Sequence, residues 1–344
     1  MYLRAFLCIM IVITHILTQY MRDISGDDTY QLKVIYYVQN LFIFGTPGFI
    51  ILSQLLTTLN YSQLKINYLI TRFKYIFLPY VIMGSFYCYS ESRKLGDSFW
   101  HQIYQNLVLG YWYGYFIIII LQYFILSYII YKISPRIFNS KILLLFSFVL
   151  QFGFLYLLHN NNEFAEILHK YYPLSDNTFI FGWIFFFFLG GYIGYNYDKI
   201  IEYLKTFPII ILVLSIVSFL IFIFAFGKHD YWNVTSYTET LMLYHTFMFL
   251  ILLSLFIHFN NFIFGIVNMV NAFSFFIYLL HPILTEYTYQ YTSIFIDTTL
   301  IFIILSLITT IGICIGIGMI LREFSICRFV IGKQPYKLKI NLIE

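Results

Sequence analysis

Charged side chains are scarce in this chain of 344 residues: only 10% are Asp, Glu, Lys or Arg, whereas 60% are hydrophobic. Soluble domains carry about 25% charged residues, so a water-soluble fold of this size could not cover its apolar surface. The hydrophobic residues form runs of about 20, the length that a helix needs to cross a bilayer. The composition therefore predicts a polytopic membrane protein surrounded by the lipid bilayer, with no nucleic acid as a partner.

Cysteine is also rare, and the four cysteines are too widely spaced for a CxxC or zinc-type pattern. The eight histidines show no metal-type spacing either. No P-loop motif for nucleotide hydrolysis occurs, and no GxSxG nucleophile elbow occurs. We expect no metal, no disulfide framework and no bound cofactor, and any transport must draw its energy from elsewhere.

Ten apolar runs predict an all-α bundle of about ten transmembrane helices in a single domain, residues 1–344. Basic side chains concentrate in the loops after the even-numbered runs and in the C-terminal tail. By the positive-inside rule, this distribution places both termini in the cytoplasm. The ninth span begins near residue 262 or near residue 272. The predicted spans are residues 2–19, 36–59, 70–89, 112–131, 141–158, 179–195, 207–226, 241–259, 272–287 and 299–320.

Two pairs of glycines have the GxxxG spacing that lets helix backbones approach closely. They are Gly190 with Gly194, and Gly312 with Gly316, and we interpret both pairs as packing faces. The Gly-Thr-Pro-Gly segment at 45–48 interrupts the second span. It indicates either an opening in the bundle or a simple kink.

Few ionisable groups lie inside the predicted spans, where they are costly to bury. Arg4 and His15 are eleven residues apart in the first span, which is three helical turns plus about 20°, and about 16 Å along the axis. They therefore share one helix face, with Arg4 placed to bind donor phosphates and His15 to act as a general base. The alternative is that Arg4 reaches the lipid headgroups and His15 forms a hydrogen bond within the bundle. His245 has no such context and is interpreted as structural.

His281 precedes Pro282 near the outer end of the ninth span. Proline removes a backbone donor and loosens the helical turn, and broken helices at membrane depth line cavities. The motif thus predicts a cavity at His281. The alternative is an interfacial histidine that ends the helix.

Five segments, in order along the whole chain, resemble the acyltransferase-3 family of multi-span membrane proteins. Arg4 and His15 match the family's Arg-x10-His opening, and Ser274, Tyr278 and His281 match its S-x-x-x-Y-x-x-H-P segment. The other three segments are 71–80, which includes Arg72, Lys74 and Pro79; the Trp-containing span 112–131; and the Phe-Phe-Phe-Leu-Gly-Gly-Tyr segment 186–192.

The resemblance implies acyl transfer and gives each matching residue a role. His15 would be the acyl-transfer histidine, and Arg4, Arg72 and Lys74 would bind an acyl-CoA donor, with succinyl-CoA the expected one. Ser274, Tyr278 and His281 would line the acceptor site or a cavity. One departure is that family members commonly carry a second arginine after Arg72, where this chain has Lys74 or Tyr75.

Three further stretches, 44–61, 230–236 and 331–338, resemble family members from biofilm operons of low-GC Gram-positive bacteria. That likeness implies a multi-pass protein of the bacterial cell membrane that works on poly-β-1,6-N-acetyl-D-glucosamine beside a membrane glycosyltransferase synthase. Two functions stay open: an O-acyltransferase for acyl groups other than amino-acyl groups, or an exporter that moves the polymer without acyl chemistry.

Overall fold

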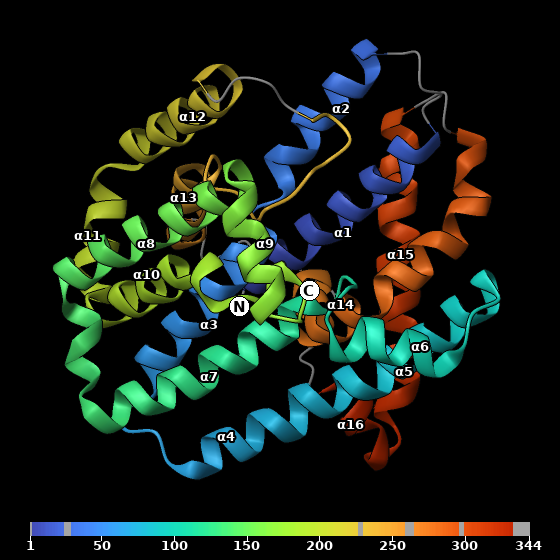
Figure 1. The fold of residues 1–344 in the computed structure, drawn as a ribbon, viewed down its shortest axis with the longest axis horizontal. Coiled ribbons are helices and arrows are strands. Elements are labelled where there is room, and N and C mark those ends of the chain that lie inside the picture. Colours follow the sequence, from blue (N-terminus) through green and yellow to red (C-terminus); the bar gives the residue numbers. More distant parts are fainter. Residues whose placement is uncertain (1, 24–28, 226–229, 259–264, 296–298, 333–344) are drawn as a thin grey trace. The chain divides into compact units, whose positions relative to one another are not determined.

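The computed structural model describes residues 2–23, 29–225, 230–258, 265–295 and 299–332, and within them every regular element is a helix (Figure 1). The α-helices are α1 (Tyr2–Asp23), α2 (Thr29–Phe42), α3 (Gly45–Asn60), α4 (Ile66–Arg72), α5 (Leu78–Leu95), α6 (Phe99–Gln102), α7 (Tyr115–Ile133), α8 (Lys141–Asn160), α9 (Asn162–Tyr171), α10 (Ile184–Tyr195), α11 (Tyr197–Thr206), α12 (Pro208–Ala225), α13 (Met242–His258), α14 (Gly265–Thr292), α15 (Thr299–Arg322) and α16 (Arg328–Ile331). The all-α prediction is confirmed.

In the described part of the chain, six helical segments are long and apolar enough to cross a membrane. They are α1, α2 joined to α3, α7, α8, α14 and α15. The pair α11 and α12, bent by 88°, makes a seventh if it is one span, and α10 and α13 are shorter apolar helices. A membrane protein with several spans is confirmed, while ten spans and cytoplasmic termini stay predictions.

Two predicted features of the spans can be compared directly with the structure. The helical path of the second span breaks at Ile43 and Phe44, immediately before Gly45, as the Gly-Thr-Pro-Gly segment predicts. A Cβ on Gly45 would overlap the side chain of Ile11, so glycine is needed where α3 begins beside α1. The ninth span begins at Gly265, closer to the earlier of the two expected starts.

The described helices form two compact units. The first contains α1, α2, α14, α15 and α16; the second contains α3 from Pro47 onward, α4 to α11, α12 as far as Phe222, and α13 as far as Ser254.

In the first unit, α1 and α14 run in the same direction. The thiol of Cys8 donates to the carbonyl oxygen of Ser274 at 3.5 Å, and seven residues later on each helix the rings of His15 and His281 meet. Seven residues are about two helical turns, so the two helices keep one register between these contacts.

Helix α15 runs antiparallel to α14. The hydroxyl oxygens of Thr288 and Thr310 are 3.1 Å apart, and the hydroxyl of Ser306 donates to that of Thr292 at 2.9 Å, so later residues on one helix meet earlier residues on the other. The start of α1 and the end of α15 therefore lie at the same end of this three-helix packing.

In the second unit, α10 packs closely on α3 through its glycines. A Cβ on Gly190 would overlap the carbonyl oxygen of Ile51, and one on Gly194 would lie 2.9 Å from the carbonyl oxygen of Leu55. The predicted packing face of Gly190 and Gly194 is confirmed. For Gly312 and Gly316 that prediction is wrong among the described residues, because a Cβ there meets nothing within 4 Å. The glycine of α15 that packs closely is Gly318, against Phe273.

Candidate functional site

His15 and His281 come together in the first unit. The ring of His15 lies edge to face with the ring of His281, with 4.9 Å between the ring centroids and 67° between the ring planes. His281 is fully buried, and its Nδ1 lies 2.9 Å from the carbonyl oxygen of Ile277. A carbonyl only accepts, so Nδ1 carries the proton and Nε2 keeps its lone pair in the neutral ring. Tertiary packing thus brings two imidazoles into ring contact in the first unit.

Arg4 lies on α1 with His15, as predicted. Its side chain is exposed, whereas Cys8, between the two, is buried against Ser274. The α1 helix is unbroken from Tyr2 to Asp23, so Arg4 and His15 are about 16 Å apart along its axis. This distance places Arg4 near the end of the unit, away from the histidine pair.

Ser274 and Tyr278 differ in how they relate to the histidine pair. The ring of Tyr278 lies 6.2 Å from that of His281, and its role at an acceptor site or cavity stays a prediction. The hydroxyl of Ser274 donates to the carbonyl oxygen of Asn271 at 3.0 Å, and its own carbonyl accepts from Cys8. Ser274 thus sits two turns away, in the contact that sets the register of α1 on α14.

The predicted effect of Pro282 is wrong. Helix α14 continues through Pro282 to Thr292, so the helix neither breaks at His281 nor ends there. Proline inside a membrane helix is tolerated because side chains and neighbouring helices supply the lost hydrogen bonds. His281 therefore stands in the middle of a helix and not at an interface.

A buried polar stripe along α14 extends further than the sequence motif. It continues beyond Ser274, Tyr278 and His281 through three threonines at alternating steps of four and three residues, which keep one helix face. The stripe consists of Ser274, Tyr278, His281, Thr285, Thr288 and Thr292, all buried. The sequence motif ends at Pro282 and does not include the three threonines. Their spacing, which continues that of the motif, is the feature of the sequence that indicates them.

Arg72 lies in the second unit, at the end of α4. Its guanidinium carbon is 5.0 Å from the ring centroid of Tyr68 and 5.1 Å from that of Phe124. Arginine stacks on aromatic faces in this way, and the contacts hold the side chain in place. The hydroxyl of Tyr68 lies 3.1 Å from that of Thr57, which fixes the tyrosine in turn.

Lys74 follows in a short π-helical segment, Phe73–Phe77. Its ammonium lies 5.8 Å from the ring centroid of Tyr75, and the side chain is exposed. π-Helical turns inside α-helices are frequent at functional sites. The segment thus presents a second cation two residues after Arg72.

His245 lies in α13 of the second unit and is 1% exposed. Neither of its ring nitrogens has a hydrogen-bond partner among the described residues, and its ring lies 6.0 Å from that of Phe186. Its surroundings are aromatic, and the structural role expected for it stays a prediction.

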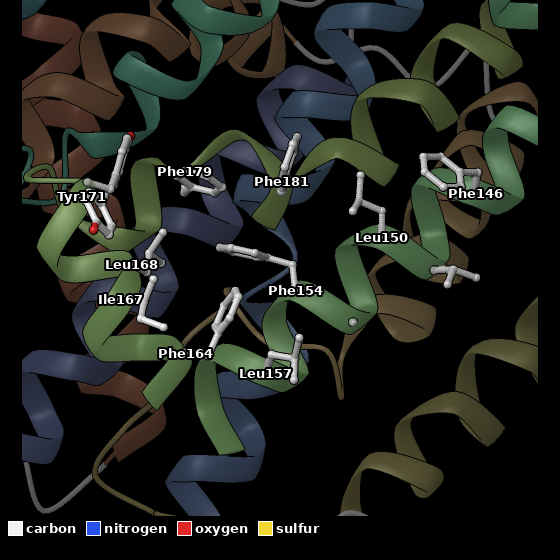
Figure 2. Close-up of a pocket in the computed structure, with 13 residues that line it drawn as sticks. Phe146, Leu150, Phe154, Leu157, Phe164, Ile167, Leu168, Tyr171, Phe179 and Phe181 are labelled. Atoms are coloured by element: carbon white, nitrogen blue, oxygen red, sulfur yellow. The ribbon is translucent and has the colours of Figure 1, made fainter. Parts of the chain in front are cut away.

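The second unit also holds an apolar cavity of about 710 Å³ between α8, α9 and the segment that follows α9 (Figure 2). Figure 2 shows rings and aliphatic groups, including Phe154, Phe164 and Phe179, directed into it. Its only polar side-chain groups are the hydroxyls of Tyr171 and Tyr172. Without a base or a cation in its lining, this cavity cannot serve as an acyl-transfer site.

Glu239, outside the predicted spans, is a buried carboxylate in contact with a histidine. Its carboxylate lies 2.9 Å from Nδ1 of His159, and the glutamate side chain is 8% exposed. Burial raises the pKa of Glu239, but hydrogen bonds, chiefly from His159, outweigh it and leave the pKa below its ordinary value. This pair ties the segment before α13 to the end of α8.

No group of three or more His, Cys, Asp or Glu residues in the described chain could hold a metal.

Comparison with known proteins agrees with the sequence motifs. Residues 2–319 match the acyltransferase domain family. The chain is 53% identical, over 99% of its length and 97% of the relative's, to the probable poly-beta-1,6-N-acetyl-D-glucosamine export protein of Staphylococcus aureus strain N315. It is 55% identical, over 99% and 96%, to the protein of the same name from Staphylococcus epidermidis. No solved structure matches the chain significantly. The chain belongs to the acyltransferase-3 family.

Proposed function

We propose that this protein is a membrane O-acyltransferase that acylates poly-β-1,6-N-acetyl-D-glucosamine during its passage to the cell surface. The observation that carries the proposal is the contact of His15 with His281, 4.9 Å between ring centroids. A general base needs a partner that orients it and stabilises its protonated form, and a neutral His281 fits that role. The names of the relatives support the polymer as the acceptor.

The chemical step requires one base. A sugar hydroxyl attacks the carbonyl carbon of the acyl thioester, a C–O bond forms and the C–S bond breaks. His15 takes the hydroxyl proton as the bond forms and returns it to the departing thiolate. The products are an acylated sugar and free coenzyme A, and His15 ends neutral, as it began. General-base catalysis of this kind contributes about 10²–10⁴-fold in rate.

The donor would be an acyl-CoA, with succinyl-CoA the expected one. Arg4 is an exposed cation on α1, Arg72 contacts two aromatic rings, and Lys74 follows it. Arginine pairs with phosphate in a fixed, two-pronged geometry, so each of these cations by itself suits a phosphate of coenzyme A.

The proposed setting is the bacterial cell membrane, with ten spans and both termini in the cytoplasm, beside a glycosyltransferase synthase. One observation supports the placement of the termini: the start of α1 and the end of α15 lie at the same end of their packing. Arg4 then faces a cytoplasmic donor, and His15 lies deeper, towards the emerging polymer.

The second candidate is an exporter that moves the polymer without acyl transfer. The names of the relatives favour it, and a polar stripe along α14 would suit a sugar path as well as an acceptor site. Deleting the protein should then stop polymer from reaching the surface. Normal surface yield after deletion would exclude this candidate.

Purified protein tests the enzyme directly. With labelled succinyl-CoA and a β-1,6-linked N-acetylglucosamine oligomer, the wild type should move label to the oligomer, and His15→Ala should not. Acetyl-CoA is the matched donor with a shorter, uncharged acyl group. Failure of the wild type to transfer any acyl group would refute the proposal.

A further inference from the structure

Three buried polar atoms in the first unit have no hydrogen-bond partner among the described residues: Oε1 of Gln39, Oγ1 of Thr285 and the hydroxyl oxygen of Tyr289. Leaving one such group unpaired costs about 1–3 kcal/mol. Nearly all buried polar groups in proteins are paired, so exceptions need an explanation. Three exceptions in one small helical unit indicate that something other than the protein satisfies them.

Two of these atoms lie at one level, one turn from the histidine pair. The amide nitrogen of Gln39 donates to the carbonyl oxygen of Thr14 at 3.0 Å and to the hydroxyl of Thr18 at 2.6 Å, so α2 is fixed to the part of α1 that surrounds His15. Thr285 follows His281 by one turn of α14. Because α1 and α14 run parallel in register, Thr285 and Thr18 share a level.

Tyr289 lies one turn further along α14. Its ring packs edge to face on the ring of Phe302, 5.6 Å between centroids, and the ring of Tyr20 packs on the same Phe302 at 5.6 Å. The hydroxyl of Tyr20 accepts from Gln31 at 2.8 Å and lies 3.2 Å from the hydroxyl of Thr299. The buried polar groups that follow the histidine pair therefore end at Phe302, on the side away from Arg4.

We propose that Gln39, Thr285 and Tyr289 form the acceptor layer, which binds the hydroxyl groups of the sugar that receives the acyl group. A carbonyl oxygen that can only accept, with two hydroxyls that both donate and accept, matches a neutral carbohydrate. A donor phosphate would need cations, whereas none of these three side chains is charged. The assignment rests on the proposed function, since it names the acceptor side of the same site.

Shape-conserving variants separate binding from folding. Thr285→Val replaces an unpaired hydroxyl by a methyl group and Tyr289→Phe deletes one, so the free protein should keep or raise its melting temperature. Thr310→Val is the matched control: its hydroxyl is already paired, 3.1 Å from that of Thr288, so its loss should lower stability and leave sugar binding unchanged. If the layer had only a structural role, its variants would not lose sugar binding while keeping their melting temperature.

The measurement is equilibrium binding of a fluorescent β-1,6-linked N-acetylglucosamine oligomer to the purified protein, with melting temperatures recorded in parallel. Each hydrogen bond contributes about 0.5–1.5 kcal/mol, so Thr285→Val and Tyr289→Phe should each raise Kd about threefold to tenfold. Gln39→Leu should do the same, provided that it folds. Unchanged affinity in Thr285→Val and Tyr289→Phe, or no binding by the wild type, would overturn the proposal.

Binding needs no acyl donor, so the two proposals can fail separately. If these variants lose sugar affinity while the wild type transfers no acyl group, the acceptor layer stands as a polymer contact and the enzyme proposal fails. If transfer occurs and the variants bind and react normally, the acceptor layer alone is wrong.

Discussion

Cys8 and Ser274 precede His15 and His281 by seven residues each, and the thiol-to-carbonyl hydrogen bond of the first pair sets the register that brings the two imidazoles together. The histidine pair is therefore a consequence of parallel packing between α1 and α14. This packing and the contacts of the second unit can be tested by substitutions.

His245 should be dispensable. Because neither ring nitrogen has a partner in the described chain, His245→Leu removes a buried polar group that costs about 1–3 kcal/mol. The variant should keep or raise the melting temperature and retain acyl transfer. A folded His245→Leu protein without transfer would show that His245 takes part in function.

Arg72 should act through the shape of its guanidinium as well as its charge. Lysine lacks the planar group that lies against Tyr68 and Phe124 and cannot pair two-pronged with phosphate, so Arg72→Lys should raise the KM for acyl-CoA about tenfold. Exposed Arg136 provides the control, and Arg136→Lys should leave KM unchanged. Equal KM values for wild type and Arg72→Lys would remove Arg72 from the donor site.

The backbone contact at Gly190 should be intolerant of a side chain. A methyl group there would overlap the carbonyl oxygen of Ile51, and overpacking costs about 1–3 kcal/mol. Gly190→Ala should lower the melting temperature in detergent, whereas Gly312→Ala, which meets nothing within 4 Å, should keep or raise it. Similar behaviour of the two variants would contradict the packing of α10 on α3.

The contact of Glu239 with His159 should make the stability of the folded protein fall at acidic pH. The pKa of Glu239 lies below its ordinary value of 4.5 in the folded protein, so its stabilising contribution is present above that value and is lost as the pH falls through the folded pKa. Glu239→Gln should therefore flatten the acid limb of the melting-temperature profile between about pH 6 and about pH 3.

The control for this profile is Glu91→Gln. Glu91 pairs with Lys94 on the same helix at 3.1 Å, and exposed pairs of this kind contribute little. An acid limb unchanged in Glu239→Gln, or flattened equally in Glu91→Gln, would argue against the role of His159.

The sequence predicted the members of the site better than their arrangement. Arg4, His15 and His281 stood out because ionisable groups in apolar runs are costly. Their pairing could not be read from the chain, since His15 and His281 are 266 residues apart and only tertiary packing joins them. Thr285, Thr288 and Thr292 continued a readable spacing, but threonine is common in helices that pack through hydroxyls.

The remaining differences are also tertiary in origin. Pro282 weakens a helix locally, yet packing holds α14 intact. The GxxxG pattern of Gly312 and Gly316 equals that of Gly190 and Gly194, and only the position of a neighbouring helix distinguishes them.

The most direct test of the central claim compares cells that express the wild type with cells that express His15→Ala at the same level. Surface poly-β-1,6-N-acetyl-D-glucosamine and its O-acyl content are measured in both. If His15 is the catalytic base, the amount of surface polymer holds while its O-acyl groups fall by about 10²-fold or more. Polymer that accumulates inside the cell with normal acylation would contradict this expectation and establish export as the primary role.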